Sequence, residues 1–219
     1  MKNMTISDRF KYIIEYFSKN MPVAETELHF KTPYELIIAV ILSAQCTDKR
    51  VNQVTPAFYK EFPTPEVLAN SNIDEIFKLI KSCSYPNNKA KNILAMAKML
   101  VSDFGSVLPS DPDILQKLPG VGRKTANVLA SVLYNKPVMA VDTHVFRVSE
   151  RIGLTQNSKN PLETEKQLTK YFPPEILPLA HHWLILHGRY VCIARKPKCS
   201  ECGLAEYCIF FEKQKQTIN

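Results

Sequence analysis

The stretch LPGVGRK, at residues 118–124, constrains the fold of this chain more than any other segment. Gly120 and Gly122 can adopt a positive φ, which predicts a tight turn with uncovered backbone N–H groups. Helical spacing follows, so we expect these groups at a helix N-terminus, where an anion is favoured. Arg123 and Lys124 add positive charge, and the segment therefore predicts an apolar hairpin between two helices that holds a phosphate without reading bases. The candidate DNA-contacting residues of this hairpin are Leu118, Gly120, Val121, Gly122 and Arg123.

The charge of the chain agrees with a polyanionic partner. Its 219 residues carry a net charge of +7, and the sequence pI is near 9.0. The first residues contain no apolar segment of the kind found in secretory signals. The longest apolar run, residues 36–42, is far shorter than the roughly 20 residues that a membrane span needs. We therefore expect a cytoplasmic protein without a membrane segment.

Apolar residues recur at helical spacing along almost the whole chain, and no segment alternates as a strand would. Ser7 is a candidate N-cap for the first helix, and a short helix starting at Asp111 leads into the hairpin. The tail after Phe211 is polar and is expected to fray. The pattern predicts an all-α fold. The expected longer helices cover residues 7–17, 33–44, 49–61, 73–81, 88–104, 123–134, 143–152, 161–171 and 174–189.

Four of the six cysteines crowd the C-terminal end with the spacing C-x6-C-x2-C-x5-C. The segment between them is polar, which argues against four unconnected buried thiols. Four converging thiolates would suit a soft metal centre. Zinc held by four thiolates is common, but zinc ribbons usually pair two C-x-x-C knuckles, whereas this segment has one. The spacing alone leaves a structural zinc and an iron–sulfur cluster about equally favoured. The four candidate ligands are Cys192, Cys199, Cys202 and Cys208.

Three motifs in this order closely resemble the bacterial endonuclease III family. They are LPGVGRKTA, VDTHVFRVSERIG and the cysteine signature, and LSAQCTD and NNKAKNI also resemble segments of that family. The hairpin alone is weakly specific, because many DNA-binding modules contain it, but the ordered combination is highly specific. The family consists of DNA glycosylases with apurinic/apyrimidinic (AP) lyase activity in the helix–hairpin–helix superfamily.

The resemblance implies two helical lobes with a DNA-binding cleft between them. A central bundle would run over residues 25–136 and contain the hairpin. Residues 1–24 and 137–219 would form the second lobe, which would carry a [4Fe-4S] cluster. The implied partner is double-stranded DNA with a damaged base or an abasic site. A monomer is expected, because one flipped base needs only one subunit.

The resemblance also assigns the chemistry. A lyase-type glycosylase needs a neutral amine that attacks the sugar C1′ and becomes a Schiff base. Lys124 lies in the first turn of a helix, where the positive end of the helix dipole disfavours an ammonium ion. The family places the nucleophile there, although a lysine in a purely binding hairpin would meet a phosphate. Asp142 is a helix N-cap candidate, and the family gives its position a carboxylate that assists the nucleophile and stabilises the cationic sugar.

Other residues are candidates for opening and holding the duplex. Gln45 matches a family glutamine that fills the gap left by a flipped base, and Tyr85 stands where the family has a wedge leucine. Arg195, Lys196 and Lys198 lie between the first two late cysteines and would form a second phosphate clamp. Two further sets are expected to be structural. These are the thiols of Cys46 and Cys83 and the imidazoles of His181, His182 and His187, while His144 is expected to shape the site.

The preferred interpretation is a bifunctional glycosylase/lyase of base-excision repair that removes oxidised or damaged pyrimidines. A mismatch-specific glycosylase of the same superfamily fits less well, because those relatives generally lack a lysine at the position of Lys124. A third interpretation is a non-catalytic hairpin DNA-binding protein with a structural metal site.

Overall fold

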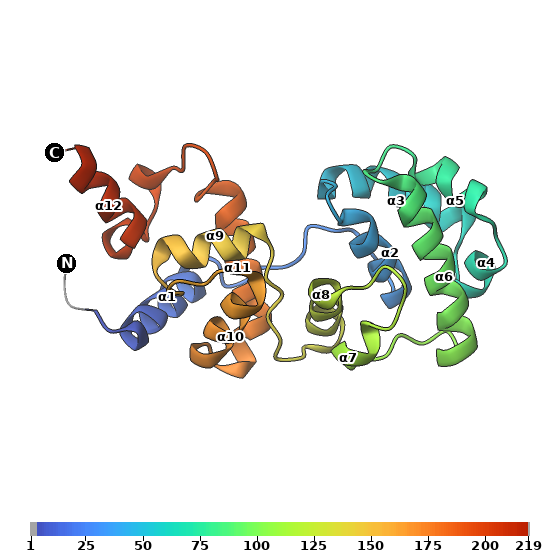
Figure 1. Ribbon diagram of the computed structural model, residues 1–219, viewed down its shortest axis with the longest axis horizontal. Coiled ribbons are helices and arrows are strands. Elements are labelled where there is room, and N and C mark those ends of the chain that lie inside the picture. Colours follow the sequence, from blue (N-terminus) through green and yellow to red (C-terminus); the bar gives the residue numbers. More distant parts are fainter. Residues whose placement is uncertain (1–3, 219) are drawn as a thin grey trace. The chain divides into compact units, whose positions relative to one another are not determined.

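The computed structural model describes residues 4–218, and all regular elements within that range are helices (Figure 1). This confirms the all-α prediction. The chain divides into two compact units. One spans Glu27–Asn135, and the other joins the residues up to Thr26 with those from Lys136 onward. Of the ranges predicted for the second lobe, residues 1–3 and 219 lie outside the described residues.

The unit Glu27–Asn135 is built around one apolar helix, α2. Its residues from Leu36 to Leu42 are at most 6% exposed, as expected for a helix that is apolar on every side. Helices α3, α6 and α8 pack against it, and α6 also contacts α4 and α5 (Figure 1). The helices of this unit are α2 (Pro33–Ser43), α3 (Asp48–Glu61), α4 (Pro65–Ala69), α5 (Ile73–Ile80), α6 (Pro86–Phe104), α7 (Pro112–Leu115) and α8 (Arg123–Tyr134).

The other unit brings the first helix of the chain against the last ones. Phe10 and Phe17 of α1 belong to the same buried cluster as Trp183 of α11 and Val148 of α9. The Trp183 indole N–H donates to the Met21 carbonyl oxygen at 2.7 Å, so the polar edge of this buried ring is paired. The elements of this unit are α1 (Ile6–Asn20), α9 (Thr143–Ile152), α10 (Pro161–Tyr171), η1 (Pro174–Ile176), α11 (Leu177–Tyr190), η2 (Cys199–Glu201), η3 (Ala205–Tyr207) and α12 (Ile209–Ile218).

Arg9 connects α1 to two distant parts of this unit. Its side chain is only 6% exposed, and its guanidinium donates to the carbonyl oxygen of Ile152 at 3.0 Å and to that of Tyr207. Ile152 is the last residue of α9, and Tyr207 is the last residue of η3. A buried charge is tolerated when it is fully hydrogen-bonded, so the two carbonyls give Arg9 a structural role.

The helix boundaries depart from prediction at three places. The N-cap of α1 is Thr5 rather than Ser7, because Thr5 and Asp8 form a reciprocal capping box. Helix α4 was not predicted, since five residues are too few to show a helical period. The tail is also helical rather than frayed. Its α12 gains contacts from cations over aromatic rings, with Arg151 4.4 Å from the Phe210 ring centroid and Lys215 4.5 Å from that of Phe211.

None of the helices in the described range combines the length and apolar character required to cross a lipid bilayer.

Candidate DNA interface and cysteine centre

The predicted hairpin forms between α7 and α8, and Gly120 determines its shape. Gly120 has φ +81°, whereas Gly122 has φ −87°, so only the first of the two glycines uses the positive φ that both can adopt. A Cβ at Gly120 would lie 3.0 Å from Asn92 Cβ on α6. The turn therefore needs glycine both for its backbone angle and for its close approach to α6.

The hairpin presents the first turn of α8 without a side-chain cap. Its N-cap is Gly122, which makes no side-chain hydrogen bond to the helix, and the first bond within the helix is from Ala126 N to Gly122 O at 2.9 Å. A side chain built at Gly122 would meet nothing within 4 Å. Gly122 therefore supplies no side-chain cap to the N-terminal end of α8, an end where an anion is favoured. Lys124 is exposed in this same turn.

The apolar residues of the hairpin anchor it from beneath. Leu118 is 1% exposed and Val121 is 5% exposed, and Val121 N donates to Leu118 O at 3.0 Å to close the turn. Their side chains therefore fill the core of the unit and leave only backbone atoms for a ligand. Arg123 and Gly122 are exposed.

Asp142 caps the N-terminus of α9. Its Oδ1 accepts hydrogen bonds from the backbone N–H groups of His144 and Val145, both at 2.8 Å. Two bonds on one oxygen fix the carboxylate, and the second oxygen remains as a further acceptor. Arg147, one turn along α9, is close enough for its guanidinium to interact electrostatically with Asp142.

Two arginines of α9 tie this helix to the segment that carries the cysteines. Arg147 donates from Nη2 to the Gly188 carbonyl oxygen at 2.9 Å and from Nε to the Cys192 carbonyl oxygen at 3.2 Å. Arg151 donates to the carbonyl oxygens of Ile193 and Ala194, each at 2.9 Å. The start of the cysteine segment is therefore held by side chains of the helix that Asp142 begins.

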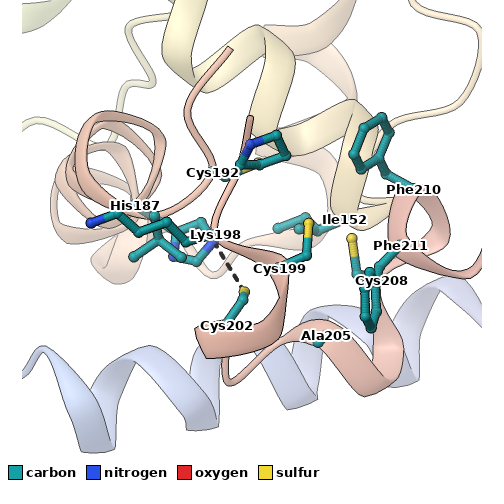
Figure 2. A pocket seen from close by; sticks show the side chains of 12 residues that line it. Ile152, His187, Cys192, Lys198, Cys199, Cys202, Ala205, Cys208, Phe210 and Phe211 are labelled. Atoms are coloured by element: carbon teal, nitrogen blue, oxygen red, sulfur yellow. Dashed lines mark hydrogen bonds between the residues drawn. The ribbon is translucent and has the colours of Figure 1, made fainter. Parts of the chain in front are cut away.

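The four late cysteines line one hollow (Figure 2). They come from the segment just after α11, from η2 with the residue after it, and from the residue before α12. Apolar side chains of Ile152, Phe210 and Phe211 complete much of the wall, and His187 faces Cys202 with Nε2 3.7 Å from Sγ. The four cysteines predicted as ligands therefore lie around the same hollow.

This hollow fits a group that takes four thiolates. All four cysteines are free thiols, and the apolar wall would shield such a group from water. Burial raises the pKa of the Cys202 and Cys208 thiols, and binding of a metal favours their thiolate forms.

The basic loop between Cys192 and Cys199 is exposed as predicted. Arg195, Lys196 and Lys198 all face solvent, and Lys196 has φ +56°. The bonds from Arg151 hold the loop at its first residues, and Lys198 N donates to Val191 O at 3.0 Å at its other side. The three cations therefore sit on a closed and anchored loop.

Gln45 and Tyr85 share an unusual backbone conformation. Gln45 has φ +53° in the turn after α2, and Tyr85 has φ 56° as the N-cap of α6, where it makes no capping bond. Both side chains are exposed, Tyr85 by 63%. A left-handed backbone at such residues costs of order 1–3 kcal/mol and tends to persist at functional sites.

Sequence reasoning missed Lys89, which supports both of these turns. Lys89 is only 6% exposed, and its ammonium group donates to the carbonyl oxygens of Leu42 and Ala44, both at 2.7 Å. It lies in the first turn of α6, so it links the start of α6 to the turn that carries Gln45. An apolar face containing one lysine was the only signal in the sequence.

The histidines are mostly structural, as predicted. The Nδ1 atom of His181 lies 2.8 Å from the Ala140 carbonyl oxygen, and burial lowers the pKa of His182 to about 4. His144 packs against Gly188, and its Nδ1 lies 3.2 Å from Arg147 Nη2. His187 has an additional position in the wall of the cysteine hollow.

Three features together define the class of protein. They are the hairpin at the N-terminus of α8, the exposed lysine in its first turn and the hollow lined by four cysteines. Residues 38–174 match the model of the HhH-GPD superfamily of base excision DNA repair proteins. Residues 192–208 match the iron–sulfur binding domain of endonuclease III. The second match settles the metal centre as iron–sulfur rather than zinc.

Individual relatives narrow the class. Endonuclease III of Rickettsia felis is 49% identical over 91% of this chain and 93% of its own length. Endonuclease III of Escherichia coli is 42% identical over 92% of this chain and 95% of its own length. A solved structure of a trapped endonuclease III–DNA covalent intermediate matches with a TM-score of 0.92 and 42% identity, covering 97% of this chain and all of that one.

The chain belongs to the endonuclease III family. It is therefore a bifunctional DNA glycosylase and AP lyase of base-excision repair that carries a [4Fe-4S] cluster.

Proposed function

We propose that this enzyme removes oxidised or otherwise damaged pyrimidines from double-stranded DNA and cuts the strand at the abasic site, with Lys124 as the nucleophile. The observation that carries the proposal is the first turn of α8. An exposed lysine stands there in the first turn of a helix whose N-cap, Gly122, supplies no side-chain cap. A phosphate bound at that N-terminus would bring the sugar of a flipped nucleotide near the amine.

Lys124 would act by covalent catalysis. Its amine displaces the base at C1′ of the flipped nucleotide, and the resulting iminium acidifies the C2′ proton. Loss of that proton breaks the bond to the 3′ phosphate, and hydrolysis releases the enzyme. The solved structure of a relative trapped as a covalent intermediate with DNA supports this type of step.

Asp142 would assist the departure of the base from the sugar. Its Oδ1 is held by two backbone N–H groups, which fixes the carboxylate without neutralising it. Negative charge held in place stabilises the positive charge that develops on the sugar, and the carboxylate can accept a proton from the attacking amine as a general base. Lys124 and Asp142 belong to different compact units, so this role requires both units to contact the same DNA.

Gln45 and Tyr85 would occupy the space left by the flipped nucleotide. Their exposure and left-handed backbone support this assignment, because a strained turn projects a side chain away from the helices that flank it. Tyr85 supplies an aromatic ring that can stack on a base.

DNA backbone contacts would come from two places. The N-terminal end of α8 with Gly120, Gly122 and Arg123 would hold one phosphate, and Leu118 and Val121 would support that contact from the core. Arg195, Lys196 and Lys198 would form the second clamp. The cluster ligands would be Cys192, Cys199, Cys202 and Cys208, and the cluster would keep this loop folded rather than take part in the chemistry.

We propose that the enzyme works as a monomer in the cytoplasm, since one flipped nucleotide needs one set of these residues. Sedimentation of the protein with a damaged duplex would give a single chain per duplex, and a stable 2:1 complex would contradict this.

Borohydride trapping on a duplex with one abasic site tests the proposal. Lys124→Gln should keep DNA affinity within about threefold and lose the trapped complex, because only the amine is needed for the Schiff base. Lys136→Gln is the matched control. It removes a lysine that follows the opposite end of the same helix, whose last residue lies about 15 Å along the helix axis from Lys124, and it should trap normally. Normal trapping by Lys124→Gln would refute the assignment.

A further inference from the structure

Two cysteines outside the cluster meet between the turns that carry Gln45 and Tyr85. Cys46 follows Gln45, and Cys83 precedes Tyr85 by two residues. The Cys83 thiol hydrogen-bonds to Cys46, although 36 residues of chain separate them. Each cysteine is fixed by its backbone, since Cys46 N donates to Ser43 O at 3.0 Å and Cys83 N to Ile80 O at 2.8 Å. The pair is therefore a built contact between two ordered turns.

The surroundings of the pair favour oxidation of Cys46 before Cys83. Cys46 is partly exposed, whereas Cys83 is 4% exposed. Burial raises the pKa of Cys83 to about 11, which suppresses its thiolate. The buried ammonium of Lys89 interacts electrostatically with both sulfurs. A soluble oxidant would therefore react with Cys46, and Cys83 would then react with the oxidised Cys46.

We propose that Cys46 and Cys83 form a reversible disulfide when the enzyme meets a hydroperoxide, and that this bond slows its action on damaged DNA. The Cys46 thiolate attacks one peroxide oxygen and breaks the O–O bond, giving a sulfenic acid and hydroxide. The Cys83 sulfur then attacks the sulfenic sulfur, and the hydroxyl group leaves as water with the Cys83 proton. Two thiols and one hydrogen peroxide thus yield one disulfide and two waters. Thiol reductants reverse the bond by exchange.

The slowing follows from the position of the pair and rests on the proposed roles of Gln45 and Tyr85. A disulfide brings the sulfurs to about 2 Å, well inside hydrogen-bond contact. The two turns would be pulled toward each other at residues adjacent to both wedge candidates. The Lys89 bonds to Leu42 and Ala44 hold the residues just before Gln45 in place, so the strain falls on Gln45. A shift of about 1 Å there is enough to slow excision by about tenfold or more.

The test treats the cluster-loaded enzyme with hydrogen peroxide and follows three readouts. Peptide mapping under non-reducing conditions should find the Cys46 and Cys83 peptides linked, with two hydrogens lost. Single-turnover excision should slow about tenfold or more and recover with dithiothreitol. The visible absorbance of the cluster should remain, which separates this effect from cluster damage. Cys46→Ser and Cys83→Ser should each keep the untreated rate and lose the reversible slowing.

Each other outcome decides against the inference. An absence of linked peptide in the wild-type enzyme overturns the disulfide, and a linked peptide without slower excision overturns its effect. Reversible slowing that persists in Cys83→Ser assigns it to another thiol. Untreated enzyme that gives no borohydride-trapped complex would instead be a failure of the proposed function, since that readout does not involve these cysteines.

Discussion

Arg147 donates a hydrogen bond from Nε to the carbonyl oxygen of Cys192 at 3.2 Å, which joins the helix begun by Asp142 to the first cysteine of the hollow. Arg151, one turn further along α9, holds the next two residues of the same segment. The cluster loop and the proposed catalytic carboxylate are therefore parts of one bonded assembly.

Replacing Arg151 by methionine should weaken that assembly. The variant keeps much of the side-chain volume but loses two charged hydrogen bonds, and we expect a free energy of unfolding lower by about 2 kcal/mol. Loss of cluster absorbance on heating should begin at a lower temperature. Arg195→Met is the matched control on the same loop, and it should reduce DNA affinity without changing cluster retention. Equal cluster retention in both variants would argue against the anchoring role of Arg151.

Gly188→Ala tests the close packing of α11 against α9. Replacing glycine by alanine inside a helix normally stabilises it by about 0.5–1 kcal/mol. A Cβ at Gly188 would lie 2.9 Å from His144 Cβ and 3.1 Å from Val148 Cγ2, neither of which is a flexible end. Overpacking costs about 1–3 kcal/mol, so we expect net destabilisation in urea titrations. Gly122→Ala, which meets nothing within 4 Å, should change stability much less. If Gly188→Ala were as stable as the wild type or more stable, α9 would have moved to accommodate the new Cβ.

Acid should destabilise the fold partly through His182. Burial and the charge of Arg189 lower its pKa to about 4 from an ordinary value near 6.5. The unfolded chain therefore binds a proton between these two pH values that the folded chain does not. This contribution is complete above pH 6.5 and declines as the pH falls toward 4. Between pH 7 and pH 5, the free energy of unfolding of His182→Gln should therefore fall by up to about 2 kcal/mol less than that of the wild type. The same substitution at exposed His29 controls for removal of an imidazole, and parallel pH profiles for wild type and His182→Gln would rule this effect out.

Tyr85→Asn should separate the cost of the strained backbone to stability from the role of the tyrosine ring in excision. Asparagine tolerates a left-handed backbone better than tyrosine, so the variant should be more stable by about 1 kcal/mol. The same change removes the ring proposed to enter the duplex, and excision of a damaged base should slow while binding to undamaged DNA persists. Urea titration and single-turnover excision measure the two effects. Faster or equal excision would remove Tyr85 from the wedge role.

The local signals in the sequence were sufficient for most helices. The Thr32–Pro33 start of α2, the Gly105 end of α6 and the range of α9 up to Gly153 all matched, because caps and helix-ending glycines act within a few residues. The cysteine spacing similarly predicted a shared hollow. These features need no knowledge of distant contacts.

What the sequence could not predict depends on long-range contacts. Gly122 and Gly120 look alike in the sequence, but only Gly120 has a positive φ and lies close to Asn92. The contact of Cys46 with Cys83 and the burial of Lys89 arise only when α6 packs beside the end of α2. The two cysteines therefore read as unrelated thiols until the fold brought them together.

The position of the covalent bond to DNA tests the central assignment most directly. The enzyme would be reduced with borohydride during reaction with an abasic duplex, digested, and mapped by mass spectrometry. The account predicts a sugar remnant on the peptide that contains Lys124, with fragment ions placing it on the side-chain nitrogen. A remnant on another amine, such as Lys136 or the chain terminus, would contradict it.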